Sequence, residues 1–111
     1  MDKPTTINIL GYQYSVEYFD NPAEVDPDKR HALWGCIDYW RRNIRVYDKQ
    51  TTPENVFHTL LHETLHGICS GLKLDDLNKD EDTIDLISMA LADVIICNGW
   101  MTLWEAECKS S

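Results

Sequence analysis

Two histidines four positions apart, with a glutamate directly after the first, form the most informative pattern in this sequence. His62, Glu63 and His66 make up an HExxH motif. Residues four apart on an α-helix lie one turn apart on the same face, so both imidazoles can reach a single metal ion. Glu63 lies about 100° around the helix from His62, where its carboxylate can hold a water molecule without binding the metal.

This arrangement suits hydrolysis by a water molecule that zinc activates. Zinc lowers the pKa of a bound water to about 7, and a neighbouring carboxylate takes the proton as the water attacks a carbonyl carbon. The motif therefore predicts His62 and His66 as metal ligands and Glu63 as the catalytic general base and acid. The competing interpretation is a pair of surface histidines. It is disfavoured because both flank the apolar side of the expected helix, which consists of Phe57, Leu61, Leu65 and Ile68.

A zinc site of this kind needs a third protein ligand and keeps one position for water. The acidic candidates after the motif are Glu81, Asp82, Asp85 and Asp93. The apolar stripe of the second expected helix begins at Ile84, and extending it back by one turn places Glu81 on the same inward face. Glu81 is therefore the preferred third ligand, and Asp82 is the alternative. Asp85, one turn after Glu81, can accept a hydrogen bond from the free ring nitrogen of a ligand histidine. An ordinary acidic helix N-terminus is the competing explanation for these acids.

Other positions near the motif keep open roles. His58 precedes His62 by four residues, and it is an alternative ligand, a group that supports a ligand, or a histidine on the helix surface. Peptide hydrolysis also needs a hydrogen-bond donor for the oxygen that becomes negatively charged. Tyr39, Tyr47 and His31 are candidates for that donor, and the sequence selects none of them.

Alternating apolar residues predict strands before the motif. Residues 5–18 have this period with an interruption at Leu10-Gly11, and residues 35–47 repeat it around a polar turn at 41–43. Each pattern is typical of a β-hairpin. The segment 20–29 between them is rich in acids and prolines, which predicts a loop.

The remainder of the chain has helical spacing. Thr52-Pro53 is typical of a helix start, and Ser70-Gly71 predicts its end. Residues 72–79 are expected to be a connector, residues 80–97 a second helix, and residues 100–108 a short terminal helix. The sequence thus predicts one α+β domain over residues 1–111. A small antiparallel sheet of two hairpins packs on the HExxH helix and on the helix that carries the third ligand.

Composition excludes several partners. The 111 residues carry 19 acidic and 10 basic side chains, a formal net charge of −9. Such a surface repels nucleic acid and anionic membranes and favours basic peptides. No apolar run approaches the ~20 residues of a membrane span, and the N-terminus is too polar for a secretory signal. These observations predict a cytoplasmic protein.

The order of these elements resembles a minimal gluzincin, a zinc peptidase of the HExxH type. The chain is similar to ImmA/IrrE-like metallopeptidase domains and to their small stand-alone relatives from phages and prophages. The resemblance rests on residues 59–68 (TLLHETLHGI) and 81–88 (EDTIDLIS) and extends over residues 5–98. It implies a zinc-dependent metallopeptidase with one Zn²⁺ per chain, in the cytoplasm of a bacterial host where a phage or prophage encodes it.

The hairpin before the motif fits a protein or peptide substrate, because an edge strand there would receive an extended chain. Two alternatives belong to other functional classes. One is a catalytically inactive protein-interaction module that the metal stabilises. The other is an acidic decoy that occupies a basic partner, in which the HExxH pattern is a coincidence. The sequence predicts neither the oligomeric state nor the cleavage specificity.

Overall fold

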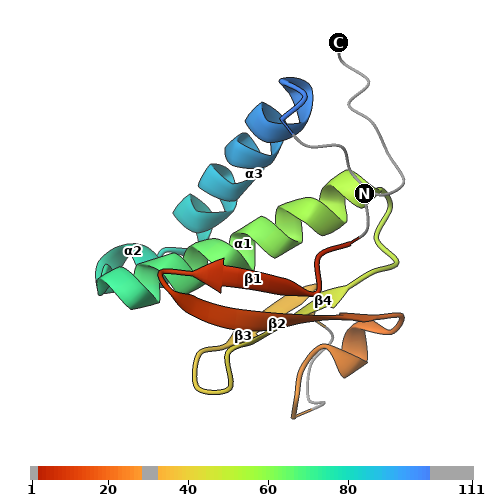
Figure 1. Cartoon of the computed structure of the whole chain (residues 1–111). Helices are drawn as coiled ribbons and strands as arrows, with labels where there is room; N and C mark the ends of the chain where they lie inside the picture. The colour runs from red at the N-terminus through yellow and green to blue at the C-terminus, as the bar shows by residue number, and fades with distance from the viewer. Residues whose placement is uncertain (1–2, 29–32, 101–111) are drawn as a thin grey trace.

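A long central helix separates a β-sheet from a second helix in the computed structural model, which describes residues 3–28 and 33–100 (Figure 1). The strands are β1 (Thr6–Ile9), β2 (Tyr12–Phe19), β3 (Gly35–Asp38) and β4 (Asn43–Tyr47). The helices are α1 (Pro53–Leu72), α2 (Asp75–Lys79) and α3 (Glu81–Cys97), and a short 3₁₀ turn covers Pro22–Glu24. The fold class is α+β, as the sequence predicts.

The sheet is mixed, with the strand order β1-β2-β4-β3. Both predicted hairpins are present, but β2 and β4 join them by parallel pairing, with Val16 opposite Ile44. The expectation of a purely antiparallel sheet was therefore wrong. Local turn signals specify each hairpin, whereas the pairing between hairpins follows from burial of their apolar sides. Val16, Ile44 and Val46 are all almost completely buried in one cluster with residues of α1.

The turn of the first hairpin lies at the predicted interruption. Leu10 and Gly11 connect β1 to β2 with φ values of 51° and 87°. Two successive residues with positive φ match the twist of antiparallel strands in a two-residue turn. Glycine adopts this conformation without a steric cost, which explains its place at the second position.

Helix α1 begins at the predicted site. The Thr52 hydroxyl accepts a hydrogen bond from the Asn55 backbone N–H at 3.2 Å, and Pro53 occupies the first turn. The helix continues beyond the expected end at Ser70-Gly71 and is capped by Lys73, whose φ of 58° is left-handed. Gly71 stays helical, and a Cβ there would lie 2.6 Å from Cδ1 at the flexible end of the Leu10 side chain.

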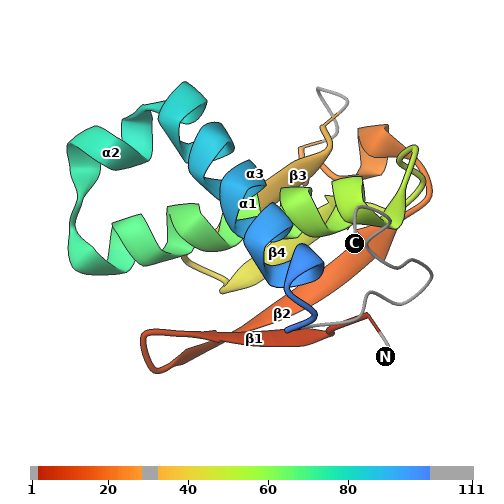
Figure 2. The ribbon, with the colours of Figure 1, turned by 90° about the horizontal axis from the view of Figure 1, so that it is seen from above.

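Helix α1 is buried on two sides. One cluster packs it on the sheet through Val56 and Leu60, and a second cluster packs Phe57 against Ala92 and Ile96 of α3. Figure 2 shows α2 at one end of the helical layer, between the end of α1 and the start of α3. The two long helices therefore stay in contact while the chain reverses direction in a short distance.

The connector and the C-terminal region differ in part from expectation. Residues 75–79 form the short helix α2, where the sequence indicated only a connector. Helix α3 agrees with its predicted range, and the Asp80 carboxylate caps it by accepting a hydrogen bond from the Thr83 N–H at 3.1 Å. The predicted terminal helix at 100–108 lies, apart from Trp100, outside the described residues. Within the described ranges, no helix is long and apolar enough to cross a membrane.

Candidate metal centre

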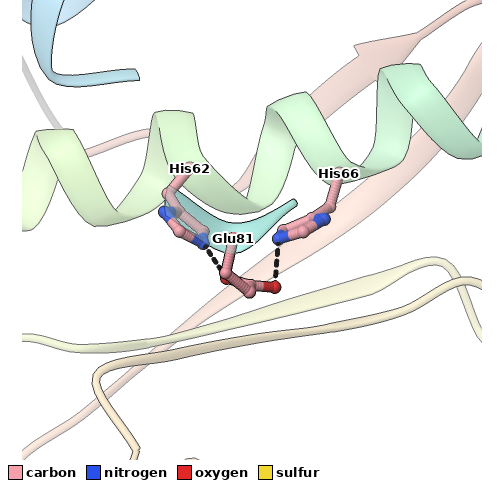
Figure 3. A group of neighbouring side chains, drawn as sticks. All are labelled: His62, His66 and Glu81. Atoms are coloured by element: carbon pink, nitrogen blue, oxygen red, sulfur yellow. Dashed lines mark hydrogen bonds and ion pairs between the residues drawn. The ribbon is translucent and has the colours of Figure 1, made fainter. Parts of the chain in front are cut away.

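Side chains from α1 and α3 converge on one point. His62 and His66 project from adjacent turns of α1, and Glu81 reaches them from the first turn of α3 (Figure 3). Glu81 Oε2 lies 3.0 Å from His62 Nε2, and Glu81 Oε1 lies 2.9 Å from His66 Nε2. Ligand atoms of the three residues all lie within 4.8 Å of one another.

These distances fit a small divalent ion. Zinc binds imidazole nitrogen and carboxylate oxygen at about 2.0–2.2 Å, so tetrahedral ligand atoms lie roughly 3.3 Å apart. The separations of 2.9 and 3.0 Å lie just below that value and involve the two different oxygens of the Glu81 carboxylate. Two imidazoles with one carboxylate also form a donor set that suits zinc. The group could therefore hold a metal ion.

The local fold explains why Glu81 reaches α1. Ile84 is completely buried where α3 packs on α1, and Glu81 lies one helical turn before it. Residues one turn apart share a helix face, so the Glu81 side chain points toward the same helix. Because α2 reverses the chain directly before α3, this first turn lies opposite the HExxH motif.

The other acidic candidates, Asp82 and Asp85, do not belong to the ligand group. In the described ranges the possible metal group consists of His62, His66 and Glu81, and Asp82 is not part of it. Asp85 Oδ1 lies 3.2 Å from His62 Nδ1, so it can accept the hydrogen of that ring nitrogen. The same oxygen lies 3.2 Å from His58 Nε2, which places His58 beside Asp85 and outside the ligand group.

Asn78 is a site residue that the sequence interpretation missed. Its Oδ1 lies 2.6 Å from His66 Nδ1 and can accept the hydrogen of that nitrogen. A hydrogen bond at Nδ1 fixes the tautomer in which Nε2 is free to bind a metal. The sequence shows an Asn three residues before Glu81, in the segment that was expected to be a connector. Nothing in that segment indicates that residue 78 lies in a helix that faces α1.

Glu63 lies beside the ligand group in a buried position, with 8% of its surface exposed. Burial and, to a smaller extent, the Glu81 carboxylate raise the pKa of Glu63 to about 8. Strand β3 contributes to this burial at Gly35. A Cβ added to Gly35 would lie 2.9 Å from Glu63 Oε2 and 2.7 Å from Thr59 Cγ2. The glycine therefore lets the backbone of β3 approach the Glu63 carboxylate closely.

A pocket of about 720 Å³ contains all of these groups. Its lining includes His62, Glu63 and His66 of α1, residues 35–37 of β3, and Tyr39 directly after that strand. Tyr47, another candidate hydrogen-bond donor, packs its ring near Trp34 at 6.4 Å and does not line the pocket. The third candidate, His31, lies outside the described residues.

Among the described residues, β3 is an edge strand of the sheet, so one side of its main chain has no neighbouring strand. Residues 35–37 of this strand line the pocket. The Tyr47 N–H donates to the Trp34 carbonyl, which makes this a hydrogen-bonded pair. Pairs alternate along an antiparallel ladder, so the next pair, Gly35 with Val46, is not hydrogen-bonded. The N–H and C=O groups of Gly35 and, two residues on, of Ile37 consequently point outward, where another strand can pair with them.

Comparisons with known proteins give no family for this chain: no protein-family model, curated protein or solved structure matches it.

Proposed function

We propose that this protein is a zinc-dependent metallopeptidase that would act in the cytoplasm, the compartment that the sequence predicts. The observation that carries the proposal is the convergence of His62, His66 and Glu81 beside the buried carboxylate of Glu63, in one pocket. Three protein ligands leave a tetrahedral zinc one position for water, which is the arrangement of catalytic rather than structural zinc sites.

Zinc bound to His62, His66 and Glu81 would acidify a water molecule and polarise the carbonyl of a peptide bond. Glu63 would take a proton from the attacking water and deliver it to the leaving amine. In the metal-free protein burial raises the pKa of Glu63 to about 8. A zinc ion bound beside it would lower that pKa again and favour the carboxylate form that accepts the proton.

Two neighbours would hold the histidines in the required orientation. Asp85 accepts from Nδ1 of His62, and Asn78 accepts from Nδ1 of His66, which directs both Nε2 atoms toward Glu81. Such partners of ligand histidines raise the basicity of the ring and fix its direction.

The substrate would bind as an additional strand on β3. An extended peptide can exchange main-chain hydrogen bonds with the outward groups of Gly35 and Ile37. Its backbone would then run along the pocket that Glu63 lines, next to the strand that contacts this carboxylate. The net charge of −9 favours a basic peptide or protein as the partner.

Glu63→Gln tests the catalytic part of this proposal. The variant keeps the size of the side chain but removes the base, so peptide cleavage should fall at least ~100-fold. Zinc content, measured by elemental analysis of the folded protein, should stay at one ion per chain, because Glu63 is not a ligand. A wild-type protein that folds without taking up zinc would refute the proposal.

A metal-stabilised interaction module is the second candidate, because the site ties together α1, α2 and α3 through Glu81 and Asn78. The two candidates differ in the response to two substitutions. If His62→Ala unfolds the protein while Glu63→Gln leaves every measured activity unchanged, the site is structural and the peptidase proposal fails.

A further inference from the structure

We propose that Tyr39 is a catalytic residue that donates a hydrogen bond to the oxygen of the scissile carbonyl as negative charge develops there. This inference rests on the proposed peptidase function and assigns the hydrogen-bond donor that the sequence left open. It is carried by the place of Tyr39 in the pocket and by its contact with Asn78.

The position of Tyr39 is suitable for contact with a bound peptide. It follows the end of β3, directly beyond the edge along which a peptide would pair, and it lines the pocket that contains Glu63 and the ligand group. Tyr39 has 40% of its surface exposed, so its side chain is accessible to a ligand in the pocket that it lines. A substrate strand on β3 would therefore pass close to the phenol.

The contact with Asn78 determines whether the Tyr39 hydroxyl can donate a hydrogen bond to another group. His66 must keep its proton on Nδ1 if Nε2 is to bind a metal, so the Asn78 oxygen is the acceptor of that bond. The other end of the same amide is then a donor, and Asn78 Nδ2 donates to Tyr39 Oη at 3.4 Å. A phenol that accepts from Asn78 retains its own O–H as a donor for another group.

The hydrolytic step gives this donor a defined task. As the bond between the water oxygen and the carbonyl carbon forms, the carbonyl π electrons move onto the carbonyl oxygen. The Tyr39 O–H would donate to that oxygen and keep its proton throughout. When the carbon–nitrogen bond breaks, the electrons return to the carbonyl, and Glu63 supplies the proton that the leaving amine needs. Burial raises the pKa of Tyr39, so the phenol stays protonated at neutral pH.

Tyr39→Phe tests the assignment by removing only the hydroxyl group. The readout is the affinity of the zinc-loaded protein for phosphinic tetrapeptides, whose charged tetrahedral group imitates the developing oxyanion and which are not cleaved. A set that varies the residues on both sides of the phosphinate allows for the unknown specificity. We expect the best binder to lose about 10- to 100-fold in affinity, the effect of removing one hydrogen bond to a charged oxygen.

Zinc affinity and thermal stability of Tyr39→Phe should remain those of the wild type. Tyr47→Phe is the matched control, because this tyrosine lies outside the pocket lining, and it should leave phosphinate affinity unchanged. Asn78→Ala should lower both zinc and phosphinate affinity, since it removes the partner of His66 as well as that of Tyr39.

The possible outcomes separate this inference from the function on which it rests. If Tyr39→Phe binds both zinc and phosphinate as the wild type does, the assignment of Tyr39 is wrong and the peptidase proposal stands. If it weakens zinc and phosphinate binding equally, Tyr39 only supports Asn78, and the assignment is again wrong. A wild-type protein that binds no zinc, or whose zinc form binds none of the phosphinates, overturns both proposals.

Discussion

The surroundings of Glu63 disfavour a charged carboxylate in two ways. It is nearly buried against the backbone of β3 and close to the Glu81 carboxylate, and both surroundings disfavour its charged form. A buried acid without a compensating cation destabilises a fold once it ionises. The presence of this carboxyl group at the second position of HExxH therefore fits a chemical role better than a stabilising one.

This leads to a pH-dependent prediction for the metal-free protein. The pKa of Glu63 is about 8 in the fold and near 4.5 in the unfolded chain. Between these values the unfolded chain binds fewer protons, so the contribution of Glu63 to the free energy of unfolding falls as pH rises. Glu63→Gln removes this loss. We expect the variant to exceed the wild type in stability by on the order of a few kcal/mol above pH 8.

Urea denaturation at a series of pH values measures this difference. Near pH 5 the wild-type carboxyl is protonated in the fold, and the two proteins should be similar in stability. A difference that does not change between pH 5 and pH 9 would show that Glu63 does not titrate in this way.

At the scale of single elements, Gly35 has a more specific role than the other glycines in the described ranges. A Cβ on Gly35 would collide with Thr59, whose side chain is short and branched, as well as with Glu63. We expect Gly35→Ala to cost about 1–3 kcal/mol in free energy of unfolding, as overpacking does. Cleavage should fall further than this cost explains, because the Glu63 carboxylate would be displaced.

Gly71→Ala is the matched control for this substitution. The Cβ it adds would meet the end of the Leu10 side chain, which is half exposed and can rotate away. Alanine also has the higher helix propensity, so the variant should be as stable as the wild type or slightly more stable. Equal effects of the two substitutions on stability and cleavage would contradict the proposed contact between β3 and Glu63.

Elements defined by local signals were predicted well, and elements defined by distant contacts were not. The Thr52 cap, the Leu10-Gly11 turn and the range of α3 all depend on neighbouring residues, and all agree with the structure. The parallel pairing of β2 with β4 depends on contacts between residues far apart in sequence, which periodicity does not reveal. One local signal failed, because α1 continues through Ser70-Gly71 to the cap at Lys73.

The residues of the candidate site also differ in whether local sequence patterns or distant contacts determine their positions. The HExxH spacing identifies His62, Glu63 and His66, and the start of the apolar stripe indicates Glu81, because helical geometry relates these positions. Asn78 could not be found in this way, and Tyr39 was only one of three candidate donors among which the sequence did not decide. Each reaches the site from an element whose position is set by the whole fold, α2 in one case and the end of β3 in the other.

At the scale of the whole molecule, a metal ion would connect the two long helices, α1 and α3. His62 and His66 belong to the central helix, and Glu81 belongs to the helix that packs on its outer side. Binding to the folded state alone stabilises it by about 4 kcal/mol when the free metal is 1,000 times the dissociation constant. We expect zinc to raise the melting temperature by at least ~10 °C, and chelators to reverse the increase.

Calorimetry with and without zinc measures this increment, and His62→Ala is the control. The variant loses one ligand, so its melting temperature should not respond to zinc at the same concentration. A wild-type melting temperature that is insensitive to both zinc and chelator would exclude a metal link between α1 and α3.

The short distance in sequence between the ligands also bears on the order of folding. His62 and Glu81 are only 19 positions apart, whereas β2 pairs with a strand from beyond the intervening loop and β3. The entropy lost on closing a loop grows with its length, so the helical segment can close around an ion at less cost than the sheet can assemble. If the site binds zinc as proposed, binding need not wait for the sheet, and zinc present during synthesis would then form a nucleus on which the strands later pack.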